Sequence, residues 1–143
     1  MPDTPETILA FDFGSRRIGV AVGQQVTASA NPLGVVKNAA NGPDWTHIEA
    51  LIKEWRPNRL VVGMPLHKDG SPSETSAKVD IFVQDLGRFA IPIDSVDERY
   101  SSVEAQGLLN DERARGIRGR IRKEMIDSVA ASLIAERWLK KGD

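Results

Sequence analysis

Three acidic sites stand in apolar surroundings in this sequence, and they are the residues best suited to carry out chemistry. Asp12 interrupts an apolar run typical of a buried strand, and Asp127 lies in an apolar stretch typical of a helix. The adjacent Asp97 and Glu98 follow a third apolar run. Burying a charged group is costly unless a cation or polar groups compensate it. Three such carboxylates therefore predict a metal-dependent site for phosphate chemistry.

Asp12 stands one residue before the expected end of its strand. With a side-chain period of two, it shares one side of that strand with Ile8 and Ala10. A turn follows at Gly14, so the carboxylate of Asp12 could instead initiate the turn by accepting backbone N–H groups. The sequence leaves both roles open.

Asp97 and Glu98 are adjacent, so in an extended segment their side chains point to opposite sides. One of the two is therefore expected to face the site. Alternatively, the pair could cap a helix that begins near Ser101, because acidic residues favour helix N-termini. Arg99 could neutralise either carboxylate.

Asp127 lies on a helix face made of small and apolar residues. Its neighbours three, four and seven positions further on are Ala130, Ala131 and Ile134. Such a face packs closely against another element, which favours a functional carboxylate over a solvent-facing charge. The alternative is a weak ion pair with Lys123 on the preceding turn.

Basic residues that could bind phosphates fall into two groups. Arg16 and Arg17 lie in the tight turn expected at 14–17. The second group lies in the basic stretch 113–123 and includes Arg118, Arg120, Arg122 and Lys123. Both groups could contact a nucleic-acid backbone, although each could also be a solvated turn or loop. The net charge of −1 argues against a strongly basic protein but conceals this local patch.

The elements that must position these residues begin with strands and continue with alternating strands and helices. Strands are expected at 7–13, 18–22, 33–36, 59–64 and 91–96, and helices at 44–56, 72–88, 101–113 and 121–140. Pro92 indicates that the last strand begins late or lies toward an edge. This order predicts an α/β fold: a mixed five-stranded sheet, its first three strands antiparallel, with helices on both faces. Ligands of such sheets bind at the carboxyl ends of strands.

Length and composition fit one globular domain over residues 1–143, with residues 1–6 expected to be a flexible N-terminus. No apolar run approaches the roughly 20 residues that span a bilayer, and the acidic N-terminus does not resemble a signal peptide. The absence of cysteine excludes disulfides, thiolate zinc sites and a cysteine nucleophile, and it fits a cytoplasmic protein. A monomer or weak dimer is expected.

Four segments carry a resemblance to a known family. They are residues 12–21 (DFGSRRIGVA), 62–66 (VGMPL) with 69–71 (DGS), 97–102 (DERYSS) and 126–131 (IDSVAA). Each is weak alone, but together and in this order they are specific and cover nearly the whole chain. With them the sequence resembles the YqgF-type family of pre-16S rRNA nucleases, also called Holliday-junction-resolvase-like proteins.

The resemblance implies an RNase H-like fold and a site of Asp12, Glu98 and Asp127, with Asp97 as a neighbouring candidate. Carboxylate oxygens suit Mg²⁺ or Mn²⁺. Two ions about 4 Å apart would activate a water and stabilise the leaving oxygen. Asp12 would be the bridging ligand, and Arg16, Arg17 and the basic stretch would bind the backbone of the substrate.

The function implied is a metal-dependent endonuclease that trims precursor 16S rRNA, with the ribosomal subunit as a possible partner. One alternative is a resolvase that cuts four-way DNA junctions by the same chemistry, which would require a dimer. Another is a non-catalytic RNA-binding factor of ribosome assembly. Nucleotide binding of the sugar-kinase or actin type is disfavoured, because the chain is too short for the second domain of those folds.

Overall fold

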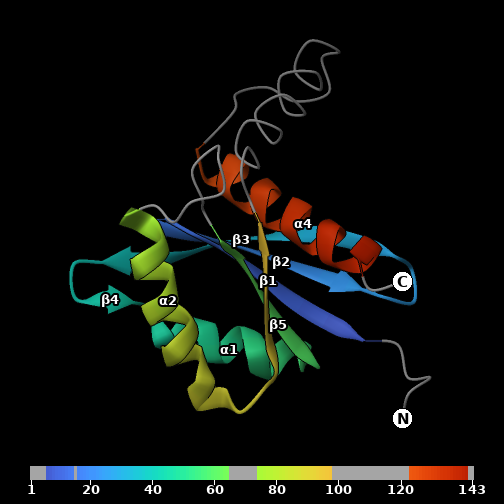
Figure 1. Ribbon diagram of the computed structural model, residues 1–143, viewed down its shortest axis with the longest axis horizontal. Helices are drawn as coiled ribbons and strands as arrows, with labels where there is room; N and C mark the ends of the chain where they lie inside the picture. Colours follow the sequence, from blue (N-terminus) through green and yellow to red (C-terminus); the bar gives the residue numbers. More distant parts are fainter. Residues whose placement is uncertain (1–5, 15, 65–73, 98–122, 142–143) are drawn as a thin grey trace.

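The computed structural model describes residues 6–14, 16–64, 74–97 and 123–141, and within them a mixed sheet forms the centre of the fold (Figure 1). Its strands are β1 (Thr7–Phe13), β2 (Arg17–Gln24), β3 (Ser29–Ala39), β4 (Gly42–Pro43), β5 (Arg59–Met64) and β6 (Ile93–Asp97). The spatial order is β4-β3-β2-β1-β5-β6. The strands β1, β2 and β3 are antiparallel neighbours, whereas β5 runs parallel to β1 and to β6. The predicted fold class is confirmed.

The prediction for the third strand was too short, and a further strand was missed. β3 runs over Ser29–Ala39 instead of 33–36, and the two-residue β4 pairs with its end, which makes six strands instead of five. Pro32 and Gly34 interrupt the alternating pattern of β3, and the register with β2 shifts between Val20 and Ala21. A two-residue strand carries no periodic signal at all.

The helices of the described residues are α1 (Trp45–Trp55), α2 (Glu74–Leu86) and α4 (Lys123–Lys141), with a short 3₁₀ helix η1 (Gly87–Phe89) after α2. The carboxylate of Asp44 accepts a hydrogen bond from the His47 backbone N–H and so caps α1. Arg56 ends α1 in the left-handed conformation. The helix expected at 101–113 and the first residues of the one expected at 72–88 lie outside the described residues.

The prediction about Pro92 is confirmed in both of its forms. β6 begins after it, at Ile93, and β6 is the edge strand of the sheet. Pro92 has no N–H to donate, but its carbonyl oxygen accepts a hydrogen bond from the Leu60 N–H. A proline is thus placed where it interrupts no central ladder.

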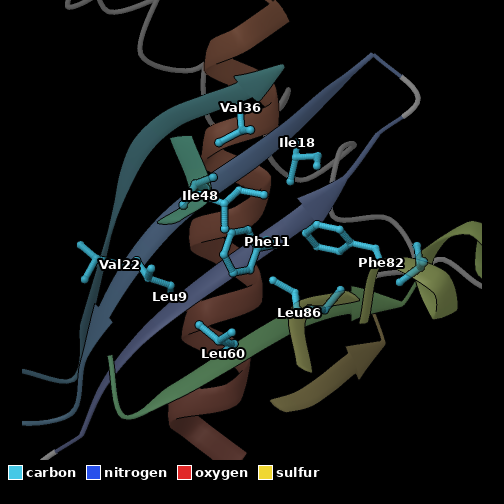
Figure 2. Close-up of a cluster of buried hydrophobic side chains, with 12 residues drawn as sticks. Leu9, Phe11, Ile18, Val22, Val36, Ile48, Leu60, Phe82 and Leu86 are labelled. Carbon is cyan, nitrogen blue, oxygen red and sulfur yellow. The ribbon is translucent and has the colours of Figure 1, made fainter. Parts of the chain in front are cut away.

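One face of the sheet is covered by α1 and α2 and is filled with large side chains (Figure 2). Leu9 and Phe11 of β1 point to this face, where the ring of Phe11 meets that of Phe82 edge to face at 5.7 Å between centroids. The ring of Trp45 stacks on that of Phe82, with 5.6 Å between the ring centroids. The burial of bulky apolar groups here provides much of the stability of the fold.

The opposite face is covered by α4, which lies across the sheet (Figure 1). The fully buried residues of this cluster are aliphatic, without an aromatic ring, and two of them are alanines: Ile8, Ala10, Val61, Ile134 and Ala135. Small side chains allow the helix backbone to approach the strands closely. Within the described residues, no helix is both long and apolar enough to cross a membrane.

Candidate functional site

Asp12 lies on the α4 face of the sheet, at the second-last position of β1. Ile8 and Ala10 belong to the cluster beneath α4, whereas Leu9 and Phe11 belong to the opposite cluster. The alternation of the strand therefore continues to Asp12, as predicted. Asp12 is half-buried, and across the antiparallel pair it stands opposite Gly19 of β2.

Asp127 lies in the second turn of α4, directly above the same glycine. A Cβ atom added to Gly19 would lie 2.0 Å from the backbone oxygen of Asp127 and 3.1 Å from the N atom of Ser128. No side chain fits there, so this glycine is what allows α4 to rest on β2. Asp12 and Asp127, far apart in the sequence, therefore both border Gly19.

The close packing predicted for the helix face around Asp127 is confirmed. Ala130, Ala131 and Ile134 have no exposed surface. Further along the same contact, a Cβ on Gly23 would lie 2.9 Å from the Ile8 side chain and 3.3 Å from the Cβ of Ala135. The helix α4 thus packs closely on the glycines of β2.

Asp127 forms an ion pair with Arg17. The Nε of Arg17 donates to Oδ2 of Asp127 at 3.1 Å, and both side chains are about three-quarters buried, at 25% and 24% exposure. The helical spacing suggested Lys123 as a partner, whereas this partner is 110 positions away in the sequence. Arg17 was predicted to bind phosphate. In the structure it contacts a predicted metal ligand.

The turn between β1 and β2 is held by Asn38 of β3. The Asn38 side-chain amide donates to the carbonyl oxygen of Gly14 at 2.7 Å, and its backbone N–H donates to that of Arg16 at 2.9 Å. These two bonds anchor the segment that joins Asp12 to Arg17. Sequence reasoning missed Asn38, because no local pattern links a residue of β3 to this turn.

The carboxyl ends of the parallel strands lie along one edge of the sheet, beside Asp12. Phe11 pairs with Val62, and Met64 at the end of β5 pairs with Asp97 at the end of β6. Glu98 follows in the sequence but lies outside the described residues. The structure therefore brings the backbone of Asp97 to the edge where Asp12 stands, as the strand order predicts.

The predicted phosphate-binding residues are placed in part. Arg16 is exposed in the turn after β1. Arg118, Arg120 and Arg122 lie outside the described residues, and Lys123 begins α4.

The chemistry of the donors fits a hard divalent cation. Asp12 and Asp127 offer carboxylate oxygens on one face, which are the ligands that Mg²⁺ and Mn²⁺ prefer. Within the described part of the chain, no three acidic or histidine side chains form a group that could hold a metal. A cation at Asp12 and Asp127 would need a further ligand. Asp97 ends β6 at this edge, and Glu98 follows it in the sequence.

A cavity of about 440 Å³ lies on the opposite face of the sheet, away from these carboxylates. Its lining comes from β3, β4, α2 and the end of β1, and includes Phe13, Asn38, Lys78, Ile81, Phe82 and Asp85. Its lining surface is mostly apolar and brings in Asp85 but not Asp12 or Asp127. Asp12 and Asp127 thus lie outside it.

Comparison with known proteins agrees with this architecture. A family model described as "RuvX: Holliday junction resolvase" matches residues 6–141. A protein of Azotobacter vinelandii named "Putative pre-16S rRNA nuclease" is 46% identical over 136 residues, which cover 94% of each chain. A protein of Pseudomonas paraeruginosa with the same name is 47% identical over 133 residues, covering 92% of this chain and 90% of the other.

Solved structures share the fold at much lower identity. Thermus thermophilus RuvC in complex with a Holliday junction substrate superposes with a TM-score of 0.56 at 17% identity, covering 96% of each chain. The yeast mitochondrial Holliday junction resolvase Ydc2 superposes with a TM-score of 0.54 at 11% identity, covering 93% of this chain and 77% of that one. The fold is RNase H-like, and the chain belongs to the RuvX family.

Proposed function

We propose that this protein is a metal-dependent endonuclease that acts on precursor 16S rRNA during ribosome maturation. The observation that carries the proposal is the placement of Asp12 and Asp127. These two carboxylates come from distant parts of the chain, lie on the same face of the sheet and border the same glycine. The names of the relatives at 46% and 47% identity support rRNA as the substrate.

The proposed metal ligands are Asp12, Asp127 and Glu98, with Asp97 as the neighbouring candidate. Asp94 and Val96 of β6 contact elements of the α4 face. Glu98 stands two positions after Val96 in the sequence and would share this face if the alternation of β6 extends past Asp97, which together with the family resemblance is the reason to prefer it over Asp97. Mg²⁺ or Mn²⁺ bound by these carboxylates would supply a more acidic water and charge neutralisation at the phosphate.

The proposed reaction also requires residues that bind the phosphodiester backbone. Water adds to phosphorus and one P–O ester bond breaks, which leaves a phosphate monoester and a hydroxyl end. We assign binding of the phosphodiester backbone to the exposed Arg16 and to the basic stretch with Arg118, Arg120, Arg122 and Lys123. The proposed substrate implies a cytoplasmic reaction, with the ribosomal subunit as a partner.

A cleavage assay tests this proposal. Purified protein is incubated with precursor 16S rRNA and, separately, with a synthetic four-way DNA junction, each with Mn²⁺. We expect cleavage of the RNA by the unmodified protein and a loss of at least about 100-fold for Asp12→Asn. If the unmodified protein and Asp12→Asn are equally inactive on both substrates, the enzymatic proposal is wrong. RNA binding that survives Asp127→Asn without any cleavage would then indicate a non-catalytic assembly factor.

The second candidate function is cleavage of DNA junctions, which the family description and the RuvC–junction structure favour. A resolvase must cut two strands symmetrically and would therefore act as a dimer. Cleavage of the four-way junction in preference to the RNA, together with a dimer in sedimentation experiments, would establish this function in place of rRNA processing.

A further inference from the structure

Asp127, one of the proposed cation ligands, is also ion-paired with Arg17. The pair connects the first residue of β2 to the second turn of α4, and the Nε of Arg17 lies 3.1 Å from Oδ2 of Asp127. Both side chains are largely withdrawn from water, at 25% and 24% exposure. At this burial the two charges interact more strongly than an exposed surface pair would.

The backbone around this pair is fixed from both sides. On the helix side, Gly19 lies so close beneath Asp127 that α4 cannot slide toward β2. On the strand side, Asn38 holds the carbonyl oxygens of Gly14 and Arg16, immediately before Arg17. The fixed backbone therefore keeps the Arg17 guanidinium within reach of the carboxylate, so its positive charge contributes to the electrostatics around Asp127.

A guanidinium and a divalent cation are both attracted by the negative charge of a carboxylate. A guanidinium that donates to Oδ2 neutralises part of that charge and competes for the oxygen. A cation at Asp127 must therefore bind beside a positive charge or displace it from Oδ2. Both cases lower the affinity of the site below what its carboxylates alone would provide.

We propose that Arg17 is a charge-balancing positioning residue that competes with the divalent cation for Asp127 and keeps the cation affinity of the site low. This inference rests on the proposed function, because it assumes that Asp127 is a cation ligand. It differs from the role predicted from the sequence, in which Arg17 binds the phosphodiester directly.

The test is the affinity for Mn²⁺ alone, measured by electron paramagnetic resonance of the free ion at about 0.15 M salt, where charges more than about 8 Å apart in solvent are screened. We expect Arg17→Gln to bind Mn²⁺ about tenfold more tightly than the unmodified protein, because the competing charge is gone. Arg17→Lys keeps the charge and should stay within about threefold of the unmodified protein.

Arg16→Gln is the matched control, because it removes the same charge from the adjacent, exposed position. Its Mn²⁺ affinity should remain within about twofold of that of the unmodified protein. The inference is overturned if Arg17→Gln binds Mn²⁺ no more tightly than the unmodified protein, or if Arg17→Lys binds it as tightly as Arg17→Gln. It is also overturned if Arg16→Gln gains as much affinity as Arg17→Gln.

A second measurement needs no variant and so does not depend on the folding of Arg17→Gln. The Arg17 Nε–H resonance of the unmodified protein is followed by NMR during a Mg²⁺ titration. We expect it to shift with the same midpoint as Mg²⁺ binding, and an unmoved resonance during binding would contradict the competition.

The failure of this inference can be separated from that of the proposed function by Asp12→Asn. If Asp12→Asn weakens Mn²⁺ binding while Arg17→Gln does not strengthen it, the cation site stands and the role of Arg17 is wrong. If Asp12→Asn binds Mn²⁺ as the unmodified protein does, the cation site itself is wrong, and the role of Arg17 falls with it.

Discussion

The two faces of the sheet are built from different residues. The face under α1 and α2 is filled with aromatic and large aliphatic side chains, with Phe82 in ring contact with Phe11, Phe13 and Trp45. The face under α4 combines glycine and alanine with the carboxylates of Asp12 and Asp127. Large side chains hold layers together at a distance, whereas small ones let a helix backbone approach a strand and position groups precisely enough for chemistry.

The largest effect on stability is expected on the face with large residues. Phe82→Ala should lower the free energy of unfolding by about 3–5 kcal/mol, because Phe82 is buried and its loss leaves a cavity among three rings. Urea denaturation measures this value. The matched control is the neighbouring Ile81→Ala, whose side chain is 59% exposed and whose loss should cost less than about 0.5 kcal/mol. Equal costs for the two variants would contradict the assignment of this face to stability.

On the other face, the largest expected effect is on activity. Gly19→Ala places a Cβ against the backbone oxygen of Asp127, so α4 must move away and carry the carboxylate with it. We expect cleavage to fall by about 100-fold, the effect of a displacement on the order of 1 Å, and stability to fall by about 1–3 kcal/mol.

Gly23→Ala is the comparison for Gly19→Ala on the same strand. Its Cβ would meet the side chains of Ile8 and Ala135, at the end of β1 away from Asp12. Gly23→Ala should therefore lower stability but change the cleavage rate by less than about threefold. The cleavage rates of the two variants are compared on the same substrate. If Gly19→Ala is as active as Gly23→Ala, the close approach at Gly19 does not position the site.

A smaller effect on stability is expected in the turn between β1 and β2. Asn38→Ala removes the hydrogen bond to the Gly14 carbonyl and should cost about 1 kcal/mol in urea denaturation. Hydrogen exchange of the backbone amides at the turn should also become faster. Asn31→Ala, at an exposed position of the same strand, is the control. If it lowers stability as much as Asn38→Ala, the hydrogen bond of Asn38 does not stabilise the turn.

The smallest effect is expected outside both faces, on the exposed side of α1. The ammonium of Lys53 lies 2.9 Å from the carboxylate of Glu49, but their side chains are 75% and 54% exposed. Lys53→Ala should therefore change the free energy of unfolding by less than about 0.5 kcal/mol. A loss above about 1 kcal/mol, measured in the same urea series, would contradict this and show that this exposed ion pair contributes substantially to stability.

The features that sequence could predict are those with a local cause. β5 was predicted with the bounds that the structure gives, and α1 to within one residue at each end, because apolar runs, helical spacing and Pro57 mark them. The orientation of Asp12 follows from the alternation of β1, and the crowding around Asp127 from its alanine neighbours.

The features that sequence could not predict depend on contacts between distant residues. The backbone atom that Gly19 accommodates belongs to a helix at the other end of the chain, so no local pattern indicates this contact. The pairing of Arg17 with Asp127 spans 110 positions, so no spacing rule could find it. Asn38 reaches the β1–β2 turn because β3 is longer than its interrupted pattern indicates.

A double-mutant cycle on cleavage tests most directly whether Asp12 and Asp127 serve one cation site. Asp12→Asn, Asp127→Asn and the double variant are compared on precursor 16S rRNA with Mn²⁺, with Asp94→Asn in β6 as the control. Each single variant should lose at least about 100-fold while the double variant loses no more, because residues that act as a unit are not additive. Multiplied losses in the double variant, or an active Asp127→Asn, would contradict a shared site.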